Sequence, residues 1–202
     1  MIYFTSDLHL GHENVLKWRK VFSSIEEMDN ILISNWNHRV HANDFVIIIG
    51  DLIFRNNNSA KEYLSSLKGK KILVKGNHDT EWIKEFSDNQ IAEYFEGIYD
   101  IYSMKRNGVK LRFCHYPMIA WESSRHESIL ICGHIHDRKE GIEAEMFSKV
   151  PYSFNAGVDI NGFTPVTLSE LIHNNDNFYG SVLNENEQAE LMKKCSLFEE
   201  MC

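Results

Sequence analysis

The sequence predicts an α/β (α+β) fold in which helices flank β-sheets, and three observations predict it. Short runs rich in β-branched and aromatic residues recur along the chain, as buried strands require. Helix-like segments separate the first three of these runs, which favours parallel pairing through right-handed crossovers. In the second half, Asn107-Gly108 stands between two extended runs, a pattern typical of a β-hairpin. The expected sheet is therefore mixed.

The first half of the chain alternates between predicted strands and helices. The strand-like runs are IYFT (2–5), FVIII (45–49) and KILV (71–74). Apolar residues from Ile25 to Trp36 recur at steps of three and four behind Ser23 or Ser24, which predicts an N-capped helix. A second helix is expected over 59–67, before the third strand.

The second half continues with more strands and ends in helices. Its strand-like runs are VKLRFC (109–114), ILIC (129–132) and YSFNAG (152–157). From 165 a further strand is expected to lead into a helix capped by Ser169. The segment 183–202 predicts either a helix with Leu191, Cys195 and Phe198 on one face or a frayed tail.

Composition limits the classes of protein to consider. The 202 residues are 43% hydrophobic and 25% charged, so we expect a single domain over 1–202 with one sizeable core. A net charge of −8 argues against bulk nucleic-acid binding. The four cysteines form no CxxC pair and are expected to be reduced. Without a signal-peptide pattern or a membrane-length apolar run, we expect a cytoplasmic protein that does not contact membranes.

Polar side chains with metal-ligand chemistry follow five of the predicted strands. They are Asp7 and His9, Asp51, Asn77, His115, and His134 with His136. In an open α/β sheet, ligands bind beyond the carboxyl ends of the strands, so these side chains can converge. The i, i+2 spacing of each pair, Asp7 with His9 and His134 with His136, places both side chains on one side of an extended backbone. Each pair can therefore hold one centre.

The donor set indicates first-row transition metals. It contains two Asp, one Asn and four His without Cys, which suits Mn²⁺, Fe, Zn²⁺, Co²⁺ or Ni²⁺ better than Ca²⁺ or a structural zinc. Seven donors exceed the number that one tetrahedral ion needs. Two ions that share a carboxylate, about 3.5 to 4 Å apart, account for them and suit displacement at phosphorus.

The ordered series D-x-H, G-D, G-N-H-D, H and G-H-x-H resembles the calcineurin-like metallophosphoesterase superfamily, particularly its small bacterial and phage-type members. The motifs cover residues 5–136, and NAGVD at 155–159 extends the resemblance. The resemblance implies a four-layer sandwich of two mixed β-sheets with helices outside. It also implies two divalent ions per chain, for which we expect Mn²⁺ first, and in-line attack on phosphorus by a hydroxide that bridges them.

The resemblance assigns a role to each motif residue. It implies that one ion is held by Asp7, His9 and His136, that the other is held by Asn77, His115 and His134, and that Asp51 bridges. His78 would face the substrate and protonate the leaving oxygen, with Asp79 holding and charge-balancing its imidazole.

Two further residues are candidates for substrate binding. Arg55 stands where related phosphatases often carry a phosphate-gripping arginine. The stretch GDLIFRN lacks the acidic residue that precedes that arginine, so a solvated loop charge is the alternative. His12 follows the Asp7 and His9 pair and is a candidate through proximity alone.

The expected activity is hydrolysis of a phosphate ester by a binuclear-metal enzyme, with a small phosphodiester or nucleotide as substrate. The absence of a recognisable cap insertion favours an open site and hence these substrates. The alternatives are a phosphomonoesterase of the same fold and a non-catalytic metal-binding scaffold. Motif completeness argues against the scaffold, whereas the fold does not decide between monoester and diester.

Overall fold

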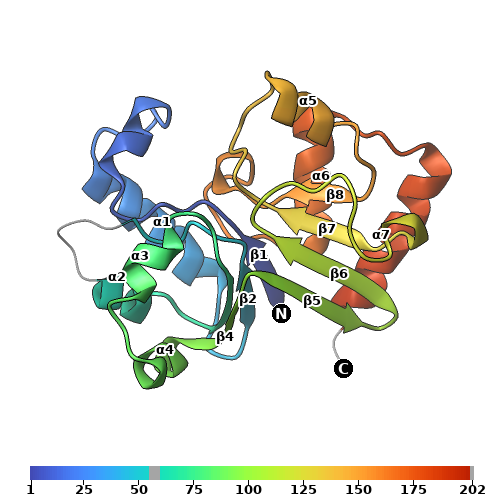
Figure 1. The fold of residues 1–202 in the computed structure, drawn as a ribbon. Helices are drawn as coiled ribbons and strands as arrows, with labels where there is room; N and C mark the ends of the chain where they lie inside the picture. Colours follow the sequence, from blue (N-terminus) through green and yellow to red (C-terminus); the bar gives the residue numbers. More distant parts are fainter. Residues whose placement is uncertain (55–59, 201–202) are drawn as a thin grey trace.

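The computed structural model describes residues 1–54 and 60–200 and contains two four-stranded sheets flanked by helices (Figure 1), which confirms the predicted fold class. The first sheet is parallel, with the strands β1 (Ile2–Thr5), β2 (Phe45–Ile48), β3 (Lys70–Val74) and β4 (Phe95–Tyr99) in that order. The second is mixed, with the strands β5 (Ile101–Arg106), β6 (Val109–Cys114), β7 (Ile129–Cys132) and β8 (Ser153–Asn155). Only β5 and β6 pair antiparallel within it.

The predicted hairpin is present, but the extended run before it belongs to two sheets. Asn107 and Gly108 connect β5 to β6, and both have the positive φ that such turns need. One residue, Asp100, separates β4 in the first sheet from β5 in the second. The residue pattern indicates extended backbone but not which strand it pairs with, so the assignment of β4 and β5 to different sheets was not predicted. The strand expected from 165 reduces to an antiparallel bridge between Val166 and Phe4.

The helical segments of the described residues are η1 (Glu13–Lys17), α1 (Ile25–Arg39), α2 (Ala60–Ser66), α3 (Asp79–Ile83), α4 (Asp88–Tyr94), η2 (Ser124–His126), α5 (Ile142–Phe147), η3 (Val158–Ile160), α6 (Leu168–Tyr179) and α7 (Glu185–Glu199). Four of them, α1, α2, α6 and α7, begin close to predicted positions, whereas the others were not predicted. Ser24 caps α1 by accepting a hydrogen bond from the Glu27 backbone. The cap of α6 is Thr167, not Ser169 as predicted, because Thr167 and Glu170 form a capping box.

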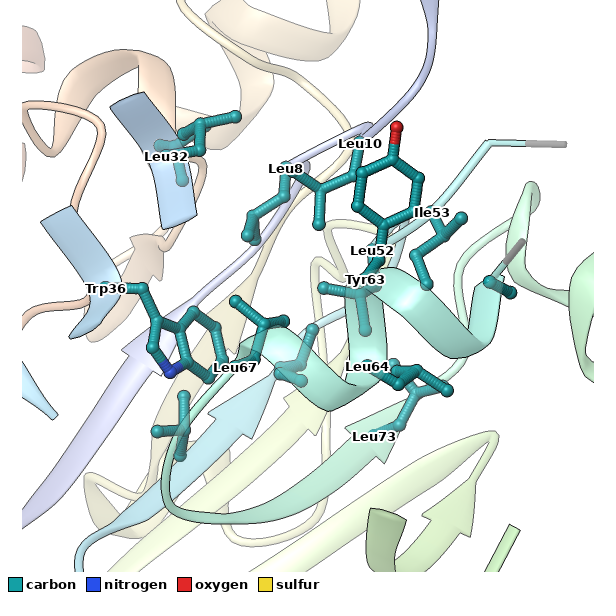
Figure 2. Close-up of a cluster of buried hydrophobic side chains, with 14 of the residues drawn as sticks. Leu8, Leu10, Leu32, Trp36, Leu52, Ile53, Tyr63, Leu64, Leu67 and Leu73 are labelled. Atoms are coloured by element: carbon teal, nitrogen blue, oxygen red, sulfur yellow. The ribbon is translucent and has the colours of Figure 1, made fainter. Parts of the chain in front are cut away.

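The outer face of the first sheet is covered by α1 and α2. Figure 2 shows Trp36 of α1 and Leu64 of α2 among the buried side chains of this cluster, with Leu73 from β3. A second cluster joins the two sheets, since Phe4 of β1 stacks on Phe113 of β6 with ring centroids 5.8 Å apart. The sheets therefore pack face to face.

The C-terminal segment is helical over Glu185–Glu199, in agreement with the helix alternative for this region. Leu191, Cys195 and Phe198 of α7 are buried, as the predicted apolar face requires. The thiols of Cys114, Cys132 and Cys195 are free and buried. Among the described residues, no helix combines the length and apolar character needed to cross a membrane.

The loops after the strands of both sheets meet at one edge. The Asp7 backbone N–H donates to the Gly50 carbonyl at 3.0 Å, which joins the loops after β1 and β2. In the second sheet, the Gly133 N–H donates to the His115 carbonyl at 2.9 Å. A parallel bridge between Ser6 and Gly157 connects the two sets of loops. The predicted ligands all lie in or beside these loops.

Candidate metal centre

The predicted ligand positions converge in space. The first group consists of Asp7, His9 and His136, and the second consists of Asp51, His115 and His134. Within each group the donor atoms lie within 4.8 Å of one another. The Oδ1 atom of Asn77 lies 3.3 Å from His115 Nε2, which adds the seventh predicted position to the second group. His78 forms a further group with His9 and Asp51.

The spacing of the donor atoms fits metal coordination. The Nε2 atoms of His9 and His136 are 3.4 Å apart, and Asp51 Oδ2 lies 3.4 Å from His115 Nε2. Ligands about 2.1 Å from an ion are separated by about 3.0 Å in an octahedron and about 3.4 Å in a tetrahedron. Asp51 Oδ2 also lies 3.7 Å from His9 Nε2, so one oxygen faces both groups. The residues therefore fit two ions that share the Asp51 carboxylate.

Five of the predicted ligands have a left-handed backbone. The φ angles are 57° at Asp7, 53° at His9, 54° at Asp51, 73° at His134 and 51° at His136. The expectation of extended backbone at the two i, i+2 pairs is thus wrong. A left-handed residue other than glycine costs about 1 kcal/mol or more and persists only where the surroundings hold it.

The two i, i+2 pairs are distributed differently over the ligand groups. Asp7 and His9 share a group, as the spacing predicted. His134 groups instead with Asp51, whereas His136 groups with Asp7 and His9. The second pair therefore spans the two groups and does not hold a single centre.

Glycine is required where the loops approach the carboxylates most closely. A Cβ on Gly133 would overlap Ser6 Oγ and lie 2.6 Å from Asp7 Oδ2. The same Asp7 carboxylate accepts hydrogen bonds from Ser6 Oγ at 2.7 Å and from the His134 backbone N–H at 3.0 Å. The glycine of the G-H-x-H motif thus permits the loop after β7 to reach the loop after β1.

Asp79 has a different position from the one predicted. Its fully buried carboxylate accepts hydrogen bonds from the backbone N–H groups of Asp51 at 2.8 Å, Leu52 at 3.0 Å and Gly76 at 2.8 Å, and from Trp82 Nε1 at 2.9 Å. With both oxygens used in this way, Asp79 holds the loops after β2 and β3 together. The expectation that it balances the His78 imidazole is corrected accordingly.

His78 lies beside the ligand groups and is only partly buried. Its backbone N–H donates to Asp51 Oδ1 at 2.9 Å. Its ring centroid is 5.4 Å from that of His9, 5.2 Å from that of Phe54 and 5.6 Å from that of His12. Ring packing and the Asp51 contact therefore position this imidazole.

A buried ion pair braces His136. Arg19, only 2% exposed, donates to both carboxylate oxygens of Asp159 at 2.7 and 2.8 Å and to the Asp7 carbonyl at 2.6 Å. Asp159 Oδ2 accepts a hydrogen bond from His136 Nδ1 at 2.9 Å. Burial raises the pKa of the Asp159 carboxyl, but His136 and Arg19 outweigh it and hold this pKa well below its usual range. Sequence reasoning included Asp159 in the NAGVD segment without a role and found no signal for Arg19.

Each group contains one imidazole whose pKa is lowered, His9 or His134, and one whose pKa is raised, His136 or His115. Burial lowers the pKa of His9 well below its ordinary value. Burial also acts to lower the pKa of His115, but its hydrogen bond with Asp51 and the charges of Asp7 and Asp51 raise it to about 9. His115 is therefore held by carboxylates as a cation, a role that a metal ion can take over.

A pocket of about 380 Å³ opens over the ligand groups. Its lining consists of His9, His12, Trp18, Asp51, Asn77, His78, His134, His136, Asp137 and Arg138. His12 thus lines the pocket, as its proximity suggested, and stacks on Phe54 with ring centroids 3.7 Å apart. Arg55 lies outside the described residues. Trp18, 45% exposed, and Arg138 line the pocket although sequence reasoning did not assign them to the site.

Comparison with known proteins identifies the family. Residues 1–160 match the calcineurin-like phosphoesterase family, a family of metal-dependent phosphoesterases, and the chain belongs to it.

The chain is also similar to individual proteins. The uncharacterized protein MJ1445 of Methanocaldococcus jannaschii is 31% identical over 175 residues, which are 85% of this chain and 89% of that protein. The gene 66 protein of Mycobacterium phage L5 is 36% identical over 80 residues, 38% of this chain and 39% of that protein. The crystal structure of the protein AQ665 of Aquifex aeolicus, of unknown function, superposes with a TM-score of 0.62 at 27% identity and covers 82% of this chain and 94% of that chain.

Proposed function

We propose that this protein is a binuclear-metal phosphoesterase that hydrolyses a small phosphodiester or nucleotide. The observation that carries the proposal is the convergence of the two ligand groups at the carboxyl ends of strands from both sheets, with Asp51 facing both and His78 beside them. A partly exposed imidazole and an open pocket over these groups leave room for a substrate.

The proposed ligands follow the two groups. In this proposal one ion would be held by Asp7, His9 and His136, the other by Asn77, His115 and His134, and Asp51 would contribute to both. Two bound divalent ions, with Mn²⁺ as our first choice, would neutralise the phosphoryl oxygens and activate a water molecule for in-line attack. Three other groups act around them: Asp79 fixes the loop that carries Asp51, and Arg19 with Asp159 orients His136.

His78 is the proposed general acid. It lines the pocket, and its ring is held by Phe54 and His12 and not by a carboxylate of Asp79. From this position His78 donates a proton from a ring nitrogen to the ester oxygen of the leaving group, which lowers the cost of breaking the phosphorus–oxygen bond.

Arg138 supplies a cation at the rim of the pocket. Its guanidinium pairs with Glu143 at 3.4 Å, and both side chains are exposed. We propose that Arg138 attracts the phosphate group into the pocket, a role that sequence reasoning considered for Arg55.

The test compares two substrates in metal-stripped protein with and without added Mn²⁺. We expect release of p-nitrophenol from bis(p-nitrophenyl) phosphate and, more slowly, from p-nitrophenyl phosphate, in both cases only with the metal. Faster hydrolysis of the monoester would favour the phosphomonoesterase alternative. Protein that holds two equivalents of metal and releases p-nitrophenol from neither substrate would contradict the proposed activity and favour a scaffold.

A further inference from the structure

A second pocket, of about 460 Å³, adjoins the first one at His134, which lines both. The loop after β6 contributes Tyr116 and Ile119 to its wall, and α5 contributes Met146 and Phe147. Because the two pockets meet at a proposed metal ligand, a molecule bound at the ligand groups can extend into the second pocket.

The chemistry of this second pocket suits an organic group and not a phosphate. Three of its apolar side chains are strongly exposed, Ile119 by 72%, Met146 by 48% and Tyr116 by 47%. Of the described residues that line it, none is Lys or Arg, and its one carboxylate, Glu143, pairs with Arg138 of the first pocket. Exposed apolar surface of this kind next to a reactive centre is typical of a ligand subsite.

Tyr116 makes the pocket suitable for a planar ring. Its own ring packs edge-on against His134, with centroids 4.8 Å apart, and against His115 at 5.2 Å. These contacts restrain the phenol side chain while about half of it stays exposed. A ring bound beside it gains both apolar burial and aromatic contact.

The lining of the second pocket does not include the proposed general acid. His78 groups with His9 and Asp51, whereas His134 groups with His115 and Asp51, and His78 is not part of the second pocket's lining. A leaving group protonated by His78 therefore departs from one side of the site, and the group in the second pocket is the one that stays on phosphorus. A phosphomonoester has no such group.

We propose that this pocket binds the retained organic group of a phosphodiester and that this group carries an aromatic or nucleobase-sized ring. The inference rests on the proposed function, which it deepens by assigning a substrate class: diesters whose non-leaving substituent is a planar ring. Glu143 at the rim accepts a hydrogen bond from an amino or hydroxyl group on that ring.

The test keeps the leaving group constant and varies only the retained one. Mn²⁺-loaded parent protein is assayed with phenyl p-nitrophenyl phosphate, methyl p-nitrophenyl phosphate and p-nitrophenyl phosphate. We expect kcat/KM for the phenyl diester to exceed that for the methyl diester by at least about tenfold, since a buried methylene alone gives this much discrimination.

A double variant localises the preference. Met146→Gln with Ile119→Gln makes the pocket polar without adding charge, and we expect it to lower the phenyl preference at least about fivefold while the methyl diester and the monoester react as with the parent. The matched control is Met192→Gln with Leu197→Gln, two residues of α7 that are 43% and 44% exposed and outside both pocket linings. It should keep the parent preference.

The outcomes separate the two proposals. Equal kcat/KM for the phenyl and methyl diesters would refute the ring subsite but leave the phosphoesterase activity standing. A phenyl preference that survives in the double variant, or an equal loss with all three substrates, would also refute the subsite. Hydrolysis of none of the substrates by the parent would refute the proposed activity itself, and the subsite with it.

Discussion

The two halves of the candidate metal centre are braced by different means. Around His136, support comes from side chains distant in sequence, because Arg19 and Asp159 form a buried ion pair that reaches its ring. Around His115, support comes from the backbone, because the ring Nδ1 donates to the Ile49 carbonyl of the loop after β2 at 2.9 Å.

The difference teaches which substitutions the two halves tolerate. A backbone carbonyl is present whatever residue supplies it, so the His115 half does not depend on the identity of residue 49. The His136 half depends on two charged side chains 140 positions apart, and removal of either leaves the other buried without its partner. Asp51 belongs to both halves.

The largest effect is expected where the halves meet. Asp51→Asn removes the charge of the proposed shared ligand, and Asn tolerates the left-handed backbone found there. We expect a folded protein that binds less than one equivalent of Mn²⁺ and has no measurable turnover of bis(p-nitrophenyl) phosphate. Metal content and activity are measured beside Asp44→Asn, which lies at the N-terminal amine and should behave as the parent. Two bound equivalents in Asp51→Asn would count against a shared ligand.

The next largest effect is a loss of turnover without a loss of metal from either half of the centre. His78→Ala should keep both ions, because the proposed ligands are all other residues, and lower kcat by about 10²- to 10⁴-fold through loss of the general acid. Metal analysis and steady-state kinetics test this prediction. His173→Ala, an exposed residue of α6, serves as the control. Parent-like turnover of the His78 variant would eliminate the assigned role.

A smaller effect should fall on one half alone. Asp159→Asn removes the charge that orients His136. We expect it to lower the Mn²⁺ affinity of one of the two sites about 10- to 100-fold, as substitution of a residue that hydrogen-bonds to a metal ligand does. Titration with Mn²⁺ should then resolve one weakened and one unchanged site. The nearby Asp137→Asn, which also changes an Asp at the pocket, should leave both sites intact. Equal weakening of both sites would mean that the halves are not braced separately.

The smallest effect is a change in the number of protons released when Mn²⁺ binds. With its pKa raised to about 9 from 6.5, His115 is protonated in the metal-free protein at pH 7.5 and must lose this proton to bind a metal ion. His9, whose pKa is lowered by burial, is already neutral. Addition of Mn²⁺ in weak buffer should therefore release protons at pH 7.5 in a pH-stat measurement. His115→Gln should release about one proton fewer than the parent. An unchanged proton count would show that His115 is neutral before metal binds.

The same shift has a defined effect on stability. In the metal-free protein, protonated His115 stabilises the folded state, since the folded pKa is raised above the unfolded value. This contribution is complete below about pH 6.5 and is lost as the pH rises through about 9. Urea denaturation of metal-free parent and His115→Gln across this range measures it.

The features that depend on residues close together in the sequence were predictable. The buried runs gave the positions of β1, β2, β6 and β7, and the ligands could be placed at their ends because parallel strands bring their carboxyl ends together. The amphipathic spacing of Leu191, Cys195 and Phe198 gave a helix as one of two alternatives for this segment, and α7 is that helix.

The remaining features depend on contacts between distant residues. No local pattern indicates that Arg19 meets Asp159 or that the Asp79 carboxylate collects four N–H donors. At Asp100 the chain passes from the first sheet to the second, although the residue pattern on both sides of it is typical of one extended strand. The left-handed ligand residues were missed for a related reason, since Asp and His adopt that conformation only where surrounding contacts hold it.

The left-handed ligand residues also bear on how such a site is lost over time. At each of these positions glycine would relieve backbone strain, and asparagine would reduce it. Asp7 and Asp51 offset this strain with hydrogen bonds that join the loops, whereas the buried Nδ1 of His9 has no hydrogen-bond partner among the described residues. Selection for folding alone therefore does not retain His9, and its persistence requires selection for what the centre does.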